Sequence, residues 1–390
     1  MITRLQVRNF KSLREVDVNL GPLNVLVGLN MSGKSNILDV FAFLHQVFIP
    51  QAGTQGVPFA IAQRGGASEV LWKGGDEKLI SISLEGFDPA DPESKFDYRL
   101  ELIIGAGEFV GTQSETLRLR RGDQSTDLLT FEHGYVKFRN TDGKDLGSVG
   151  QPGTSAMQYA QPNWDGYKFF DWVRRWRFYH LVPPVMKQPS LMSLGQVLGR
   201  NGENLSAWLM WIQANSPEAF ARLNEVLHDL FPDVTQVRAI PTPDGKVYLA
   251  ATERGLRRPT AVWQASDGFL MLTALLSLVY VPPELGGSLF CIEEPENNLH
   301  PRLLETLVQL LRQVREEATK AGMPLSQIIA TTQSPYLVDQ LSLDEVIWVE
   351  KKNGETKAYR PSDRTHLREL VENKELGLGD LMFTGALRKE

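Results

Sequence analysis

The stretch Gly28-Leu29-Asn30-Met31-Ser32-Gly33-Lys34-Ser35 decides how the rest of this sequence is interpreted. Its two glycines, Gly28 and Gly33, allow the backbone to curl so that several N–H groups point at one anion. Lys34 adds a positive charge for the outer phosphates of a phosphate chain, and Ser35 offers a hydroxyl to a divalent cation. The stretch therefore predicts a loop that binds the phosphates of a nucleotide.

The segments on either side of this loop supply the context that it requires. Residues 23–27 form a short apolar run, which predicts a buried strand. In residues 34–47 the apolar positions recur at helical spacing, so a helix would aim its positive N-terminal end at the phosphates. Strand, glycine loop and helix together predict a P-loop. The residues expected to contact the nucleotide are Gly28, Asn30, Ser32, Gly33, Lys34, Ser35 and Asn36.

The composition is that of an ordinary globular protein. The 390 residues are 42% hydrophobic and 23% charged, and the formal net charge of -6 argues against a protein that coats nucleic acid non-specifically. The single cysteine, Cys291, excludes an internal disulfide and a thiolate zinc cluster. No apolar run reaches the ~18 residues of a membrane span, and residues 1–13 lack an apolar signal segment. We therefore expect a cytoplasmic protein that does not contact membranes.

Outside the loop, the sequence divides into regions with different periodicity. Alternating stretches at residues 79–84, 98–104, 116–120 and 135–138 predict a β block, and the Gly/Ser/Gln/Pro-rich residues 140–163 predict a linker. Residues 165–232 are predicted to be largely helical, most clearly at 206–213 and 217–230, and residues 288–349 alternate strand and helix. The pattern predicts an α/β fold whose nucleotide-binding core is split by a β block and a helical insertion.

A second buried strand ends in two adjacent carboxylates, Glu293 and Glu294. A P-loop enzyme needs an acid at the end of a neighbouring strand to hold Mg²⁺, and a base to orient the attacking water. Because successive strand residues point to opposite sides, the two carboxylates can serve these two roles. We predict that one of the two holds Mg²⁺ together with Ser35 and that the other is the base. The alternative is a solvated strand end, which the segment 295–301 disfavours.

Further segments stand in a fixed order around these two sites. They are Leu5-Gln6-Val7-Arg8-Asn9-Phe10-Lys11-Ser12-Leu13, Ala265-Ser266-Asp267-Gly268, Glu293-Glu294-Pro295-Glu296-Asn297-Asn298-Leu299-His300-Pro301 and Thr331-Thr332-Gln333-Ser334-Pro335. They resemble, in chain order, the first strand, the signature motif, the Walker B and D-loop, and the switch segment of ABC-type ATPase heads of the RecF, SMC and OLD families. The order and spacing match along residues 1–45 and 260–350.

This resemblance implies a P-loop NTPase of the ABC ATPase-head type, with an antiparallel β subdomain and a helical insertion. Residues 1–140 would form the N-terminal ATPase lobe with the P-loop and β subdomain, and residues 141–235 the linker and helical insertion. Residues 236–390 would form the C-terminal ATPase lobe with signature, Walker B and switch segment. OLD nucleases carry a nuclease domain after the ATPase, and the roughly 40 residues after Val349 are too few for one. We therefore expect an ATPase without a nuclease domain.

The same resemblance implies that ATP and Mg²⁺ lie between two subunits. Ser266 and Gly268 of one subunit would cap the γ-phosphate held by the other, and one chain has one P-loop and one signature, so a homodimer would form around ATP. By the same resemblance, Glu293 would hold Mg²⁺ and Glu294 would be the base. Gln63 would be the Q-loop glutamine that contacts Mg²⁺, against the alternative of an ordinary loop residue. Two positions depart from the family: the Walker B acid, commonly Asp, is Glu293, and the catalytic switch residue, commonly His, is Gln333. Glutamine can hydrogen-bond a phosphate or water but does not titrate near neutral pH.

As a function, the resemblance implies an ATP-hydrolysing head that controls a separately encoded effector, a nuclease or toxin, in DNA repair or anti-phage defence. The alternative is a non-hydrolytic, ATP-dependent scaffold that holds such a partner. Glu294 favours the enzyme, whereas Gln333 leaves room for the scaffold. A transporter ATPase is disfavoured by the Ser-Asp-Gly signature. Basic clusters at 174–177 and 254–258 leave DNA binding open, against the alternative of arginines that merely lie along a helix surface.

Overall fold

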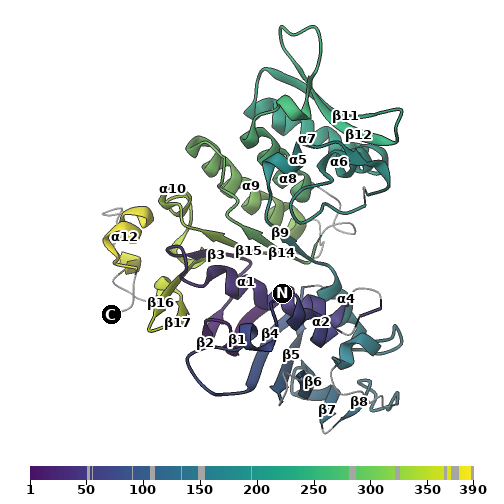
Figure 1. Ribbon diagram of the computed structural model, residues 1–390, viewed down its shortest axis with the longest axis vertical. Helices are drawn as coiled ribbons and strands as arrows, with labels where there is room; N and C mark the ends of the chain where they lie inside the picture. Colours follow the sequence, from purple (N-terminus) through teal and green to yellow (C-terminus); the bar gives the residue numbers. More distant parts are fainter. Residues whose placement is uncertain are drawn as a thin grey trace.

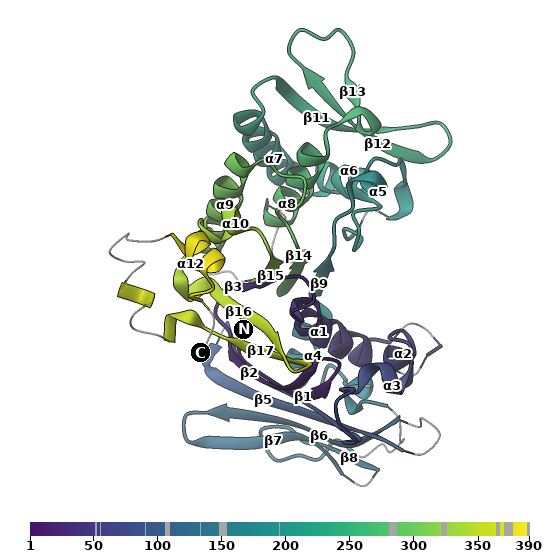
Figure 2. The same cartoon turned by 60° about the vertical axis from the view of Figure 1, so that its left-hand side comes forward.

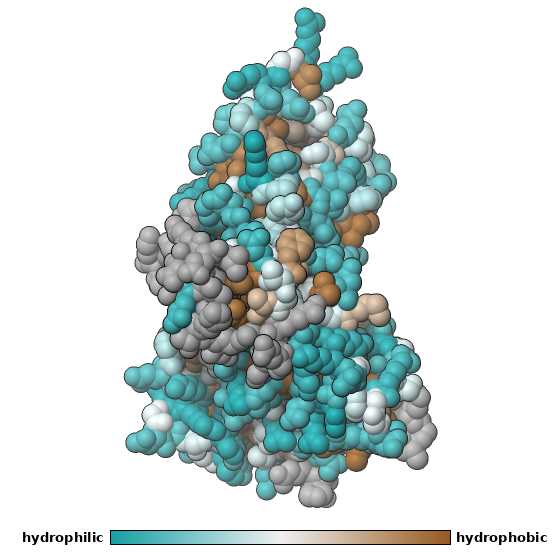
Figure 3. Space-filling model, turned by 90° about the vertical axis from the view of Figure 1, so that its left-hand side faces the viewer, coloured by the Kyte–Doolittle hydropathy of each residue, from teal (hydrophilic) through white to brown (hydrophobic). Residues whose placement is uncertain are grey.

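The computed structural model describes residues 1–50, 53–54, 56–89, 91–105, 110–132, 134–147, 154–194, 196–280, 287–320, 326–363, 367–369 and 377–387. A central sheet separates two lobes (Figures 1 and 2). The lower lobe holds a larger antiparallel sheet, and the upper lobe holds a group of helices and a small sheet. Hydrophilic side chains predominate on the face shown in Figure 3.

The central sheet has six strands in the order β17-β16-β3-β15-β14-β9. They are β3 (Leu23–Val27), β9 (Trp176–Tyr179), β14 (Leu289–Glu293), β15 (Gln327–Thr332), β16 (Val346–Lys352) and β17 (Glu355–Tyr359). Strands β9, β14, β15, β3 and β16 are parallel, and β17 pairs antiparallel with β16. The carboxyl ends of parallel strands meet at one edge, where open α/β sheets bind ligands. The loop after β3 and the turn after β14 therefore lie at the same edge.

Helices pack on both faces of this sheet. Helix α1 (Lys34–Phe48) belongs to one hydrophobic core and α8 (Asp267–Tyr280) to the other. The strand β14 shows the division, because Cys291 packs in the core of α1 and Ile292 in the core of α8. Successive strand residues point to opposite faces, so Glu293 shares the α1 side with Cys291.

The lower lobe is a seven-stranded antiparallel sheet in the order β2-β1-β4-β5-β6-β7-β8. Its strands are β1 (Ile2–Phe10), β2 (Leu13–Asn19), β4 (Leu79–Asp88), β5 (Asp91–Ile104), β6 (Val110–Arg121), β7 (Gln124–Glu132) and β8 (Tyr135–Phe138). The sheet confirms the predicted antiparallel β block and adds β7, which the sequence prediction omitted. Leu128 and Leu129 are both buried in β7, so this strand lacks a clean alternation.

The upper lobe and the chain around it contain the remaining elements. The upper lobe contains helices α5 (Pro183–Met186), α6 (Leu205–Asn215) and α7 (Pro217–Leu230), and strands β10 (Ser190–Leu191), β11 (Val234–Pro241), β12 (Lys246–Glu253) and β13 (Thr260–Ala261). Helix α4 (Tyr167–Arg174) instead packs with α1, in the core on the side of the larger sheet. Elsewhere lie α2 (Gly56–Ala62), α3 (Ala67–Val70), α9 (Pro301–Lys320), α10 (Pro335–Val338) and α12 (Leu378–Thr384). Of the helices within the described residues, none is both long and apolar enough to span a bilayer.

The largely helical prediction for residues 165–232 is wrong at Trp176–Tyr179. This segment is β9, which pairs in parallel with β14 and buries Trp176. The arginines around it do not form a helical basic face: Arg174 and Arg175 pair with Asp171, and Arg177 donates to the carbonyl oxygens of residues 174 and 176. Four residues are too few to show strand periodicity, and pairing with β14 decides their conformation.

Candidate nucleotide-binding site

The loop after β3 curls around its own lysine. Lys34 Nζ donates to the carbonyl oxygen of Gly28 at 2.8 Å and to that of Leu29 at 3.0 Å, and the residue is 6% exposed. Burial lowers the pKa of Lys34, and the nearby carboxylates of Glu294 and Glu296 partly oppose this effect. The P-loop lysine is therefore desolvated, and phosphate oxygens would replace two neutral carbonyl partners by stronger, charged ones.

The backbone of the loop leaves no space for side chains at its glycines. A Cβ at Gly28 would lie 2.1 Å from the carbonyl oxygen of Val349. One at Gly33, whose φ is 105°, would lie 2.0 Å from Thr356 Oγ1. Ser32 Oγ is buried and has no hydrogen-bond partner among the described residues. Because buried hydroxyls are almost always paired, this hydroxyl and the curled backbone fit a loop that takes up phosphate.

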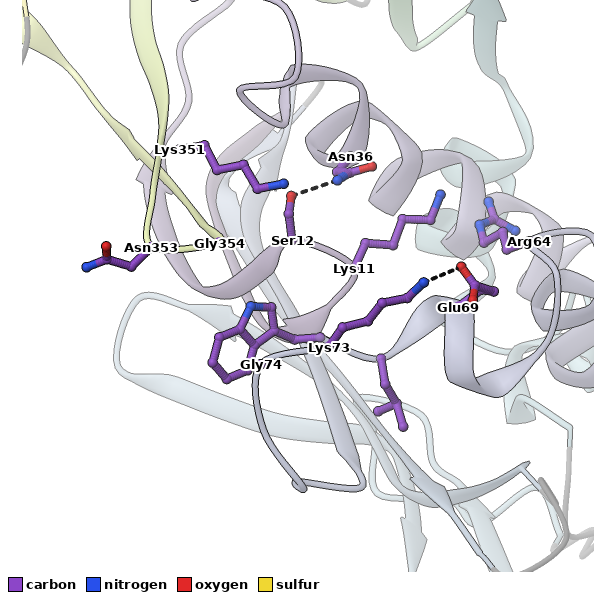
Figure 4. A pocket seen from close by; sticks show the side chains of 12 residues that line it. Lys11, Ser12, Asn36, Arg64, Glu69, Lys73, Gly74, Lys351, Asn353 and Gly354 are labelled. Atoms are coloured by element: carbon purple, nitrogen blue, oxygen red, sulfur yellow. Dashed lines mark hydrogen bonds and ion pairs between the residues drawn. The ribbon is translucent and has the colours of Figure 1, made fainter.

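The other predicted P-loop residues differ in where their side chains lie. Asn30 and Ser35 are exposed. Asn36 turns away from the loop and donates through Nδ2 to Ser12 Oγ at 2.7 Å (Figure 4). Ser35 and Glu293 are the residues that would hold Mg²⁺, and their hydroxyl and carboxylate oxygens are of the ligand type that Mg²⁺ prefers. Ser35 and Glu293 therefore fit an Mg²⁺ ion whose other ligands are mainly phosphate oxygens of the substrate.

The turn after β14 holds its two glutamates in different surroundings. Glu293 accepts a hydrogen bond from Arg200 Nη2 at 3.1 Å. Glu294 has a φ of 45°, which is unfavourable for a residue with a side chain. Its N–H donates to the carbonyl oxygen and to Oγ1 of Thr331, both at 3.2 Å, and its carboxylate accepts from Asn297 Nδ2 at 2.8 Å. Hydrogen bonds to Thr331 of β15 therefore hold Glu294 in an unfavourable backbone conformation, and this conformation turns Glu294 away from Glu293.

Glu296 is a further site residue, to which the sequence motif alone assigns no role. It is 8% exposed, and its Oε1 accepts from the Thr332 hydroxyl and from the N–H of Gln333. Its Oε2 is buried, and no hydrogen-bond partner lies within the part of the chain that the structure describes. Burial raises the pKa of Glu296, and the charge of Glu294 adds to this effect. Glu296 therefore ties the turn after β14 to the switch segment after β15.

The signature segment packs on the same turn. A Cβ at Gly268 would lie 2.7 Å from the carbonyl oxygen of Asn298, so only glycine fits at this contact. Asp267 pairs with Lys187 at 2.6 Å. Ser266 is exposed at the start of α8, and its Oγ accepts from the N–H of Phe269 at 3.3 Å. Helices α8 and α1 pack on opposite faces of the central sheet. The signature at the start of α8 therefore lies on the opposite side of the sheet from the P-loop helix α1 of the same chain.

The two predicted glutamines are both exposed. Gln63 follows directly after α2, and its neighbour Arg64 reaches back to Asp39 of α1 at 2.6 Å. Gln333 follows β15, and its backbone N–H donates a hydrogen bond to Glu296 Oε1. The structure thus brings Lys34 close to the acid turn, whereas the roles of Gln63, Gln333 and Ser266 stay predictions.

A pocket of about 570 Å³ lies beside the first turn of α1 (Figure 4). Its lining includes four cationic side chains and one indole ring: Lys11, Arg64, Lys73, Lys351 and Trp72. Ser12 and Asn36 form the wall toward α1. Thr356 connects this wall to the P-loop, because its Oγ1 donates to the carbonyl oxygen of Ser32 at 2.9 Å and lies 2.7 Å from Ser12 Oγ.

Comparisons with known proteins agree with this arrangement. A family described as "AAA ATPase domain" matches residues 1–84, and a family described as "AAA domain, putative AbiEii toxin, Type IV TA system" matches residues 196–339. An "OLD nuclease" from Thermus scotoductus is 44% identical over 59 residues, which are 13% of this chain and 11% of that nuclease. The chain therefore spans about a tenth of the length of this curated relative.

Solved structures of SMC heads share the fold. A head bound to the C-winged helix domain of ScpA superposes with a TM-score of 0.55 at 16% identity, over 92% of this chain and 96% of that one. A head with an extended coiled coil, bound to the C-terminal domain of ScpA from Pyrococcus furiosus, gives 0.53 at 14%, over 95% and 99%. The expected ABC ATPase-head fold is confirmed. The chain thus contains two regions that match AAA domain families, in the expected order, on a fold similar to that of SMC heads.

Proposed function

We propose that this protein binds and hydrolyses ATP with Mg²⁺ at the edge of the central sheet. The observation that carries the proposal is the meeting of two sequence-distant parts at Lys34. Its buried ammonium lies in the P-loop, and the carboxylates whose charges act on it, Glu294 and Glu296, belong to the turn after β14. Phosphate binding and an acid that orients water are the two requirements of nucleotide hydrolysis.

The pocket beside α1 is where we place the nucleoside. It shares Asn36 with the first turn of the P-loop helix, and the half-buried Trp72 offers an aromatic surface for a base. Of its cations, Lys11 and Arg64 pair with Asp39 and Lys73 pairs with Glu69, so the α-phosphate of a nucleotide would compete with these carboxylates for them. A nucleotide in this position would run from Trp72 along Ser12 to Lys34, with its terminal phosphate next to Glu294.

In this arrangement the chain's residues divide the work of hydrolysis. Lys34 and the loop N–H groups bind the β- and γ-phosphates. Ser35 and Glu293 would hold Mg²⁺, which when bound would neutralise negative charge on the phosphates. Glu294 accepts a hydrogen bond from the attacking water and orients it, and Gln333 offers an amide to the water or the γ-phosphate.

The signature supports a composite site made by two copies of the chain. Ser266 is exposed, lies at the start of a 14-residue helix and faces away from the P-loop side of its own sheet. A hydroxyl and N–H groups at the positive end of a helix attract an anion. We infer that Ser266 and Gly268 cap the γ-phosphate bound by a second copy, which makes ATP the link in a homodimer.

An ATP-controlled dimer would act on a separately encoded effector. The family description that names a type IV toxin system and the short likeness to an OLD nuclease support a nuclease or toxin as the effector, and DNA repair or defence as the setting. If ATP is bound but not hydrolysed, the dimer would be a scaffold that holds this partner.

Steady-state phosphate release by wild type and Glu294→Gln tests the hydrolysis. Loss of the water-orienting carboxylate is expected to slow release by about 10²- to 10⁴-fold while ATP binding is kept. Glu305→Gln, which changes an exposed carboxylate on α9, is the matched control and should keep the wild-type rate. Equal rates in wild type and Glu294→Gln would refute the role of Glu294, and wild-type binding without release would favour the scaffold.

A further inference from the structure

Arg200 stands next to the acid that is expected to hold Mg²⁺. Its Nη2 lies 3.1 Å from Glu293 Oε1, and this ion pair joins the upper lobe to the end of β14. The Arg200 side chain is 60% exposed, whereas that of Glu293 is 24% exposed. Glu293 is thus a largely covered carboxylate whose cationic partner reaches it from the solvent side.

The loop that carries Arg200 is fixed by its own hydrogen bonds. The carbonyl oxygen of Arg200 accepts from the N–H of His180 at 2.9 Å, and that of Asn201 accepts from the N–H of Val182 at 3.1 Å. The N–H of Asn201 donates to Glu203 Oε2 at 3.0 Å. The loop therefore continues alongside the residues after β9, the neighbour of β14, and holds the base of the Arg200 side chain next to Glu293.

Three carboxylates crowd this edge of the sheet. Glu293, Glu294 and Glu296 lie within four consecutive residues, and the charges of Glu294 and Glu296 act on Lys34. Glu293 takes its countercharge from Arg200 instead. A half-buried carboxylate without a partner costs free energy. Arg200 offsets this cost at Glu293 by supplying the positive charge that a divalent cation would otherwise supply.

We propose that Arg200 is a placeholder for Mg²⁺: it neutralises Glu293 in the nucleotide-free protein and is displaced when the metal arrives with the nucleotide. This inference rests on the proposed function and adds a regulatory step to the same site. An exposed ion pair is weak, so its exchange for Mg²⁺ costs little and sets how much Mg²⁺ the site requires.

The test uses the full chain and a fluorescent ATP analogue, with Mg²⁺ titrated at constant nucleotide concentration. Arg200→Ala and Arg200→Gln should each lower the Mg²⁺ midpoint by about two- to fivefold, the shift that an exposed ion pair supports. Arg200→Lys should lie nearer to wild type. Binding of the analogue in EDTA should be unchanged in all three variants. Arg222→Ala, an exposed arginine on α7, is the matched control.

A double-mutant cycle assigns the effect to the pair. In a Glu293→Gln background, Arg200→Ala should no longer shift the midpoint. An unchanged midpoint in both Arg200→Ala and Arg200→Gln would overturn the proposal, and so would a raised midpoint, which would make Arg200 a phosphate ligand. If wild type does not bind the analogue at all, the nucleotide function itself fails, which separates the two failures.

Discussion

The P-loop and the turn after β14 meet at Lys34, but they are held in place in different ways. The lysine is bound by carbonyl oxygens of its own loop, from Gly28 and Leu29. In the turn, Glu293 depends on Arg200, and Glu296 depends on the segment after β15. The P-loop half of the site is thus held mainly by contiguous residues, to which Thr356 adds a hydrogen bond on the carbonyl oxygen of Ser32, whereas the other half depends on contacts between distant segments.

This difference predicts what each half controls. A loop that arranges its own backbone binds phosphate by charge and N–H groups, so damage to it should remove nucleotide binding. The conformation of the turn after β14 depends on the elements that contact it. Substitutions in this turn should therefore change the rate of hydrolysis, the Mg²⁺ concentration that is required or the stability, while nucleotide binding remains. The following changes, in order of expected effect, test this division.

The largest effect is expected from Lys34→Ala. It removes charge-assisted hydrogen bonds to phosphate, each worth about 1.5–3 kcal/mol, so ATP affinity should fall by about 10- to 100-fold or more. Stability should change by less than about 1 kcal/mol, because burial lowers the pKa of Lys34 and its loss also removes a desolvated ammonium. Isothermal titration and urea unfolding measure the two quantities. Lys246→Ala, in the β11–β12 turn, is the control, and unchanged ATP affinity in Lys34→Ala would contradict the P-loop assignment.

The next effect concerns the signature, which lies in neither half. Ser266→Arg should leave ATP binding by the monomer within about twofold of wild type, since the Ser266 hydroxyl accepts from the N–H of Phe269 at its own helix start. It should block ATP-dependent dimerisation, because a bulky cation replaces the small group that caps the partner's phosphate. Light scattering of Glu294→Gln with and without this change measures the association. Equal dimerisation in both proteins would rule out the composite site.

The same division explains what the sequence could predict. The P-loop follows from one contiguous motif, and the predicted helix at 217–230 matches α7 because Pro217 and the apolar spacing are local signals. The strand at Trp176–Tyr179 was missed because it is defined by pairing with β14. The positions of Arg200 and the buried Glu296 also depend on contacts with distant segments, which the sequence does not show. For Glu296, its place in a turn rich in amide side chains was the available sequence signal.

The smallest effect is expected at Glu296, where the pH dependence of stability tests the distant half. Burial raises the pKa of Glu296 above its ordinary value of 4.5. At a pH between 4.5 and the raised pKa, Glu296 keeps its proton in the folded protein but has lost it in the unfolded chain. Its contribution to the free energy of unfolding therefore falls as the pH rises through this interval. Glutamine cannot ionise and keeps an oxygen that accepts from Thr332.

Glu296→Gln should therefore match wild type near pH 4.5 and become progressively more stable than wild type at higher pH. The expected difference is at most about 1–3 kcal/mol, the range for a buried polar group without a partner. Urea unfolding of nucleotide-free protein at several pH values from 4.5 to 8, about the range in which most proteins are stable, measures it. Glu305→Gln should show no such trend. A difference that shrinks as the pH rises would mean that Glu296 is stabilised as a carboxylate by Lys34, and that the turn is held by charge, as the P-loop is, instead of by its contacts with β15.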